Sequence, residues 1–220
     1  MLLDNKNSGH VGKELKSHVF EGSKLSVLSS LFTIYGYLSL KKELSKLSNV
    51  RLLLSDWRHQ NLQALIGADN ELRLTNQLDQ KRIAKECAKW LSGKVEVKAG
   101  INLQQASQNI FHLDNSEHPD FAVHGSATFT PTGLGEVRSD ALQMNTGITD
   151  HETTQQLSSW FDSIWSDDAS AKVIKKELIE KLDYMAEDQP ANFVYFLTLY
   201  NIFKDFLADI QNKITLQTTL

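Results

Sequence analysis

The chain has 220 residues, of which 41% are hydrophobic, and its formal net charge is -4. This length and composition suit one sizeable α/β core and exclude the disordered and fibrous classes. No apolar run reaches the roughly 20 residues that span a bilayer, and the N-terminus lacks the pattern of a signal peptide. We therefore expect a cytoplasmic protein with no membrane partner.

Residues that could bind a metal or a cofactor are sparse. Cys87 is the only cysteine and has no zinc or redox spacing around it, and the seven histidines form no H-x-x-x-H or H-x-H pair. We predict no metal site and no cofactor. The acidic balance argues against nucleic-acid binding over the whole surface, although it leaves room for a local basic groove.

The first half of the chain has the pattern of a strand–helix–strand unit. Residues 25–35 form a continuous apolar run rich in β-branched and small side chains, which predicts a buried strand. Residues 40–47 have helical spacing, and residues 50–54 form a second strand-length run. This order favours parallel pairing of the two strands. Residues 55–78 show little periodicity and are predicted to be loops with one short helix.

Asp79 is a candidate N-cap for a helix whose apolar residues recur at helical spacing and which ends near Gly93. Short apolar runs after it predict a sheet of five or more strands. The runs are residues 95–97, 109–113, 121–126 and 141–148.

The last third of the chain has helical patterns. Asp150 begins a helix whose apolar face includes Trp160, Phe161 and Trp165, a spacing typical of a core-facing helix rather than of base stacking. Two further helices are predicted at residues 171–185 and 192–210. We divide the chain into an α/β domain over residues 1–168 and a helical extension over residues 169–220, which packs on that domain or on a partner.

Three segments resemble a known superfamily. They are SQNIFHLDN from Ser107, FAVHGSATFTPTGLG from Phe121, and ALQMNTGITD from Ala141, followed by a helix that ends in WFDSIW. In this order they resemble the phospholipase-D-like superfamily, in the form found at the N-terminus of bacterial DEAD/DEAH-type and Swi2/Snf2-type helicases and in some restriction nucleases. The GS-x-x-FT-x-x-GL stretch is the most specific piece, and weaker likeness covers nearly the whole chain.

The resemblance implies a mixed or parallel sheet flanked by helices. It also implies a phosphodiesterase site in which a His attacks phosphorus, while a Lys and an Asn stabilise the phosphoryl oxygens. Ser107 stands at the position of that His and Asn109 at that of the Lys, and neither can replace its chemistry. The degenerate site predicted in this way consists of Ser107, Asn109, Asp114, Ser126, Thr128 and Gln143, with Ala141 at a second Asn position.

Two histidines close to these segments offer a different alignment. Neither His112 nor His124 begins an H-x-K sequence, and each is more simply read as a half-buried strand residue. We keep His124 as a reserve catalytic candidate because it adjoins the glycine turn that follows it.

A basic stripe runs along the helix that begins near Asp79. It consists of Lys81, Arg82, Lys85 and Lys89. These side chains could contact a phosphate backbone if they lie on the same face as the degenerate site. The alternative is the ordinary solvated face of an amphipathic helix.

The sequence is compatible with three alternative functions. The favoured one is a catalytically degenerate phospholipase-D-like module that binds DNA or a partner subunit in a helicase-linked phage-defence or restriction system. The second is an active, metal-independent DNA phosphodiesterase that works as a dimer through Ser107 or His124. The third is a structural protein that uses the fold to assemble. The expected partners are therefore DNA, a helicase or another defence subunit, in a homodimer or a hetero-complex.

Overall fold

The computed structural model describes residues 1–57, 61–67, 77–101 and 108–187. The chain divides into two compact units, Met1–Ala186 and Glu187–Leu220. Beyond Glu187 the second unit lies outside the described residues, and so does the helix predicted at residues 192–210.

The first unit is built around an eight-stranded mixed sheet with the order β1-β7-β6-β5-β2-β3-β4-β8. The strands are β1 (Leu2–Leu3), β2 (Lys24–Ser29), β3 (Asn49–Leu54), β4 (Val95–Gly100), β5 (Asn109–Asp114), β6 (Phe121–Gly125), β7 (Asn145–Ile148) and β8 (Ala171–Val173). The described helices are α1 (Val11–His18), α2 (Ile34–Leu44), α3 (Leu62–Ile66), α5 (Gln77–Ser92), α6 (Pro131–Leu134), α7 (His151–Trp165) and α8 (Lys175–Ala186).

The sheet changes from parallel to antiparallel at β2. β2, β3 and β4 are parallel to one another, as the strand–helix–strand pattern predicts. β5 pairs antiparallel with β2, and β6 and β7 continue as an antiparallel meander. The short strands β1 and β8 close the two edges, each antiparallel to its neighbour. The predicted fold class, a mixed α/β sheet flanked by helices, is confirmed.

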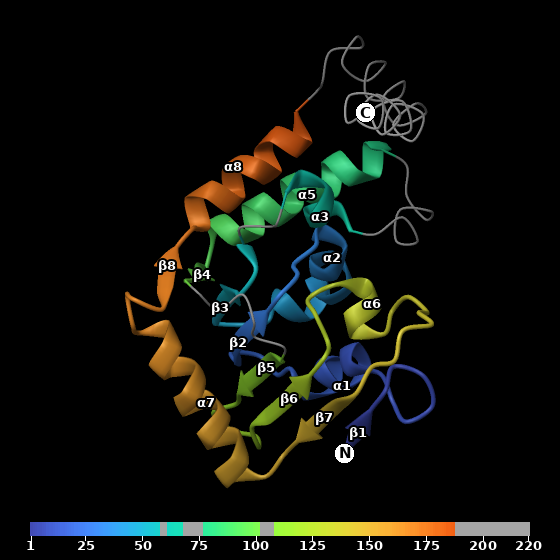
Figure 1. Ribbon diagram of the computed structural model, residues 1–220, viewed down its shortest axis with the longest axis vertical. Helices are drawn as coiled ribbons and strands as arrows, with labels where there is room; N and C mark the ends of the chain where they lie inside the picture. The colour runs from blue at the N-terminus through green and yellow to red at the C-terminus, as the bar shows by residue number, and fades with distance from the viewer. Residues whose placement is uncertain (58–60, 68–76, 102–107, 188–220) are drawn as a thin grey trace, which may run out of the picture. The chain divides into compact units, whose positions relative to one another are not determined.

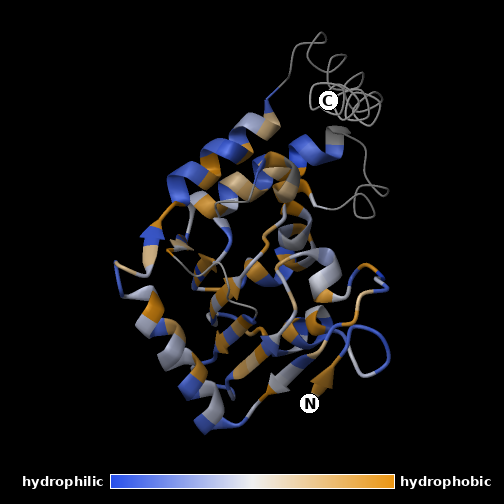
Figure 2. Cartoon of the chain, in the orientation of Figure 1, coloured by the Kyte–Doolittle hydropathy of each residue, from blue (hydrophilic) through white to orange (hydrophobic). Residues whose placement is uncertain are grey.

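Helices cover both faces of the sheet (Figure 1). On one face α7 packs Phe161 and Trp165 against Leu28, Leu53 and Ile110. The larger core lies on the other face, where residues of α1, α2, α5, α6 and α8 pack against the alternate strand residues. Figure 2 shows hydrophilic and hydrophobic patches alternating along α5 and α8, as expected of helices with one buried side. Central strands buried on both faces explain why their sequences are continuous apolar runs.

The predicted strand over residues 25–35 is wrong in its second half. β2 ends at Ser29, and α2 begins at Ile34 after the N-cap Thr33, whose side chain accepts a hydrogen bond from the backbone N–H of Gly36 at 3.0 Å. The apolar run spans both elements because the first turn of α2 is as deeply buried as the strand. Burial on all sides removes the periodicity that separates a strand from a helix.

Two other boundaries also differ. The strand predicted at residues 141–148 begins only at Asn145, and the helix predicted at residues 171–185 is strand β8 followed by α8. β8 pairs with β4 through Lys98 and Val173, so its extended form depends on a neighbour remote in sequence. β8 and α8 both lie beyond the predicted domain boundary at residue 168 and within the first compact unit.

A close backbone approach at the start of α2 gives a testable consequence. A Cβ atom at Gly36 would lie 2.3 Å from the carbonyl oxygen of Phe129. We expect Gly36→Ala to lower the free energy of unfolding by about 2 kcal/mol, because the backbone must shift to admit the methyl group. Ser39→Ala, in the same helix, should stay within about 0.5 kcal/mol of wild type. Urea denaturation followed by circular dichroism measures both, and equal stability of the two variants would contradict the close approach.

Candidate functional site

Of the predicted site positions that the structure describes, all but Asp114 lie near the carboxyl end of the parallel strands. β5 begins where β2 ends, because the two strands are antiparallel and Leu28 lies opposite Ile110. Asn109 at the start of β5 faces Gly125 at the end of β6, which faces Asn145 at the start of β7. This edge of an α/β sheet is where ligands commonly bind.

The amide of Asn109 is bound within the protein through both its oxygen and its nitrogen. Asn109 is 4% exposed. Its Oδ1 atom accepts a hydrogen bond from the backbone N–H of Ser30 at 2.8 Å, and its Nδ2 atom donates to the carbonyl oxygen of Ser126 at 3.2 Å. Asn109 therefore joins the end of β2 to the end of β6. Ser107, the other position of the predicted catalytic pair, lies outside the described residues.

The hydroxyl groups after β6 serve the local backbone. Ser126 is exposed, and its Oγ atom accepts a hydrogen bond from the backbone N–H of Met144 at 3.1 Å. The Oγ1 atom of Thr128 lies 3.1 Å from that of Thr130, which caps α6 by accepting from the N–H of Gly133 at 3.0 Å. A Cβ atom at Gly133 would lie 2.3 Å from the carbonyl oxygen of Thr128, so this turn requires glycine.

Gln143 is bound to the N-terminal segment. Its Oε1 atom accepts a hydrogen bond from Nδ2 of Asn5 at 2.6 Å, and its Nε2 atom donates to the carbonyl oxygen of Thr132 at 3.2 Å. Asn5 has a φ angle of 57°, and its Oδ1 atom accepts from the N–H of Val11 at the start of α1. Gln143 therefore links the N-terminal segment to α6. Ala141 lies exposed in the loop before it.

Sequence reasoning missed Asn145, although it belongs to the same group of side chains. Asn145 is 1% exposed. Its Oδ1 atom accepts from the N–H of Ala127 at 2.7 Å, and its Nδ2 atom donates to the carbonyl oxygen of Leu3 at 3.1 Å. The available signal was its position two residues after Gln143, within the segment ALQMNTGITD. We call Asn109, Gln143 and Asn145 the amide cluster.

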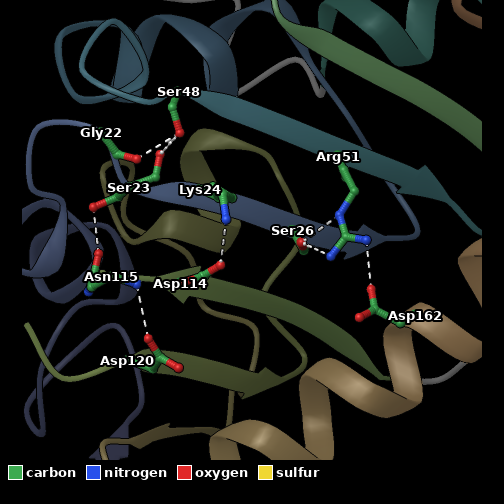
Figure 3. A network of polar contacts seen from close by, with 10 residues as sticks. All are labelled: Gly22, Ser23, Lys24, Ser26, Ser48, Arg51, Asp114, Asn115, Asp120 and Asp162. Carbon is green, nitrogen blue, oxygen red and sulfur yellow. Dashed lines mark hydrogen bonds and ion pairs between the residues drawn. The ribbon is translucent and has the colours of Figure 1, made fainter. Parts of the chain in front are cut away.

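Asp114 is not part of the amide cluster. It lies at the far end of β5 from Asn109. Its carboxylate pairs with the ammonium of Lys24 at 3.2 Å, and both side chains are about half exposed (Figure 3). An exposed pair of this kind adds little to stability.

His124 also lies apart from Asn109. It pairs in register with Ile110, which packs under α7, whereas Asn109 pairs with Gly125. Because successive strand residues face opposite sides of the sheet, the side chains of His124 and Asn109 point to opposite faces. The reserve candidate therefore does not supply a base to the amide cluster.

A partly buried arginine lies on the α7 face of the sheet, and the sequence prediction did not include it. Arg51 pairs with Asp162 of α7 at 2.6 Å and donates two hydrogen bonds to Oγ of Ser26 (Figure 3). Its guanidinium lies 5.0 Å from the ring centre of Phe161. The signal was an arginine inside the apolar run VRLLL. These contacts hold α7 on the sheet.

His112, opposite Ser26 in the sheet, is 3% exposed, and its Nε2 atom has no hydrogen-bond partner in the described part of the chain. Burial lowers the pKa of His112, which favours the neutral ring. A neutral histidine covered by α7 is consistent with a structural role.

The basic stripe does not line the amide cluster. Lys81 is half-buried, and Arg82 is bound by Glu86 at 2.9 Å and by Asp79 at 3.5 Å. Lys85 and Lys89 are exposed. Lys89 lines a cleft with residues at the amino ends of β3 and β4, which is the opposite end of the sheet from Asn109.

Within the described ranges, no three His, Cys, Asp or Glu side chains are grouped so that they could hold a metal ion. Cys87 is buried, and burial raises the pKa of its thiol. In this part of the chain no helix combines the length and the apolar character needed to cross a membrane.

Comparison with known proteins returned structural likenesses only. No protein-family model matches the chain, and no curated protein matches it. Among solved structures, polyphosphate kinase from Porphyromonas gingivalis is similar over 76% of this chain and 21% of its own, with a TM-score of 0.46 and 10% identity. Phosphatidylserine synthase from Haemophilus influenzae is similar over 88% of this chain and 42% of its own, with a TM-score of 0.43 and 13% identity.

A third structure is TrmBL2, an archaeal chromatin protein described with a novel mode of DNA binding. It is similar over 76% of this chain and 51% of its own, with a TM-score of 0.40 and 13% identity. The chain thus spans between about a fifth and a half of the length of these three structures. All three TM-scores lie below 0.5, so these likenesses assign no family.

The amide cluster predicts a strong penalty for a charge at Asn109. In Asn109→Asp, a carboxylate oxygen replaces the donor that faces the carbonyl oxygen of Ser126. We expect a loss of about 3 kcal/mol in the free energy of unfolding at pH 7. Burial beside a carbonyl oxygen raises the folded-state pKa of the new carboxyl. The loss should therefore shrink as the pH falls through that value and be smallest below about pH 3.9.

Urea denaturation of wild type and variant at pH 7 and pH 4 tests this expectation. Asn61→Asp is the matched control, because the exposed Asn61 accepts from the N–H of Ala64 through its Oδ1 atom at 2.8 Å, an acceptor that aspartate keeps. It should remain within about 0.5 kcal/mol of wild type at both pH values. If Asn109→Asp were tolerated equally well at pH 7, the site would have to be open to water.

Proposed function

We propose that this chain is a phospholipase-D-like module without phosphodiesterase activity, which acts by binding DNA or a partner subunit in a helicase-linked phage-defence or restriction system. The observation that carries the proposal is the amide cluster. The described side chains at the predicted catalytic positions around it are neutral, and Asn109 and Gln143 each use both donor and acceptor on the protein itself.

The chemistry of a covalent phosphodiesterase explains why this matters. The attacking group must be a nucleophile with access to phosphorus, and fixed positive charge must surround the pentacoordinate intermediate. Asn109 supplies neither, and its amide is already bound on both sides. Ser126 has an exposed hydroxyl, but the group closest to it in the hydrogen-bond network is the backbone of Met144, which is not a base.

Binding is favoured over catalysis by the surface of α5. Lys85 and Lys89 are exposed on successive turns, a spacing that places two positive charges side by side. Phosphate contacts by lysine give affinity without chemistry. The partner-subunit version of the proposal rests on the resemblance alone.

The proposal predicts that the purified protein does not cleave DNA in the presence of EDTA. Plasmid relaxation and linearisation on agarose gels measure this activity over several enzyme concentrations. Ser107→Ala and His124→Ala should behave like wild type. If wild type cleaves in EDTA and either variant abolishes cleavage, the active, dimeric nuclease is the correct function.

DNA binding should depend on the stripe. We expect Lys85→Ala/Lys89→Ala to reduce the slope of log affinity against log salt by about 2 on duplex DNA, because each lost phosphate contact removes about 0.9. Lys13→Ala/Lys24→Ala removes the same charge from other elements and should leave the slope unchanged. Fluorescence anisotropy with a salt series provides the measurement. An unaltered slope in both variants would mean that Lys85 and Lys89 do not contact phosphates and form an ordinary solvated helix face. A stable oligomer without any DNA binding would indicate an assembly role.

A further inference from the structure

A cleft of about 520 Å³ lies between α2 and α5, at the amino ends of β3 and β4. It is outside the amide cluster and at the opposite end of the sheet. Its volume is in the range of small-ligand sites. One wall is formed by Tyr37 of α2 and Trp90 of α5, whose ring centres are 5.0 Å apart.

The two aromatic residues differ in burial. Tyr37 is 3% exposed and its hydroxyl donates to the carbonyl oxygen of Glu86 at 3.5 Å. Trp90 packs against the core but is only partly buried. Trp90 therefore offers part of an indole surface to the cleft, in contact with the tyrosine ring. Leu47, Val50 and Val95 line the same cleft, so its lining is apolar beside the indole.

The rim of the cleft is basic. Lys41, Lys89 and Lys94 line it together with one acid, Glu86. Lys41 binds Glu86 at 2.8 Å, and Arg82 binds the same carboxylate at 2.9 Å. Hydrogen bonding to Lys41 lowers the pKa of Glu86, so that this acid is charged and compensated. Within the described residues no carboxylate pairs with Lys89 or Lys94, and both are exposed.

We infer that this cleft binds single-stranded nucleic acid, with an unpaired base against Trp90 and the flanking phosphates at Lys89 and Lys94. An aromatic face with lysines around it is the combination that binds single strands, because every base stacks and every phosphate pairs. The inference rests on the proposed DNA-binding function. It adds that the nucleic acid is single-stranded and that it binds in this cleft.

Other occupants use only part of this site. A duplex keeps its bases stacked inside the helix, so it could contact the lysines but not the indole. An acidic peptide would satisfy the lysines, yet a cleft about the size of one nucleotide gives little length for a peptide helix. The single strand uses the aromatic wall, the apolar lining and the unpaired charges together.

The experiment is fluorescence anisotropy with a labelled ten-residue oligothymidylate, using the full chain. Lys89→Ala/Lys94→Ala should reduce the slope of log affinity against log salt by about 1.4, since each phosphate contact on a single strand contributes about 0.7. Trp90→Leu keeps an apolar side chain on the core and should weaken binding about tenfold, as expected for the loss of one stacked base. Circular dichroism melting confirms that each variant is folded.

Lys13→Ala/Lys24→Ala is the matched control for charge and should leave the affinity for the single strand within about twofold of wild type. If Trp90→Leu does not fold, tryptophan fluorescence provides a second test. Binding of the oligonucleotide should quench the emission of Trp160→Phe, which keeps Trp90, but not that of Trp90→Phe.

Three outcomes would overturn the inference. The first is no binding of the single strand by wild type. The second is equal weakening by the cleft and control variants. The third is displacement of the oligonucleotide by oligoglutamate as effectively as by unlabelled oligothymidylate, which would mean that charge alone is recognised. If duplex binds through Lys85 and Lys89 while the single strand does not bind, the proposed function stands and this inference falls.

Discussion

The structure depends on neutral amides that join the strand ends where the sheet turns from parallel to antiparallel. At that edge the backbone leaves several strands at once, and its N–H and C=O groups need partners away from water. Asn109 and Asn145 each donate one hydrogen bond and accept another, so each amide satisfies both an N–H and a C=O group of the backbone without adding charge. The close approach of Gly133 to Thr128 lets α6 pack against the same junction.

This arrangement separates the two ends of the sheet. At the carboxyl end of the parallel strands, polar side chains bond to the protein's own backbone. The amino end holds a cleft with a partly exposed indole and with Lys89 and Lys94, which pair with no carboxylate of the described residues. The α7 face is different again, because Arg51 and Asp162 hold a helix rather than a ligand there. At the edge where α/β sheets commonly bind ligands, the amides of this chain bond to its own backbone instead.

Much of the fold could be predicted from the sequence, and the reasons for the failures are physical. β3, β5 and β6 were found because strands buried on both faces are continuous apolar runs. β8 was missed because AKVIKKEL has helical composition, and its extended form comes from pairing with β4. For the site, the positions of Asn109 and Gln143 came from motif order, but the partners Ser30 and Asn5 lie too far along the chain for local patterns to predict.

The pairing of β1 with β7 also affects the order in which the strands of the sheet assemble during folding. The backbone of Leu3 lies opposite Asn145, and the amine of Met1 donates to the carbonyl oxygen of Gly147 across 146 positions of sequence. Contacts so distant in sequence form late, because the whole intervening loop must close first. β1 is therefore expected to be among the last strands to join the sheet. Until it joins, the outer edge of β7 is exposed to neighbouring chains.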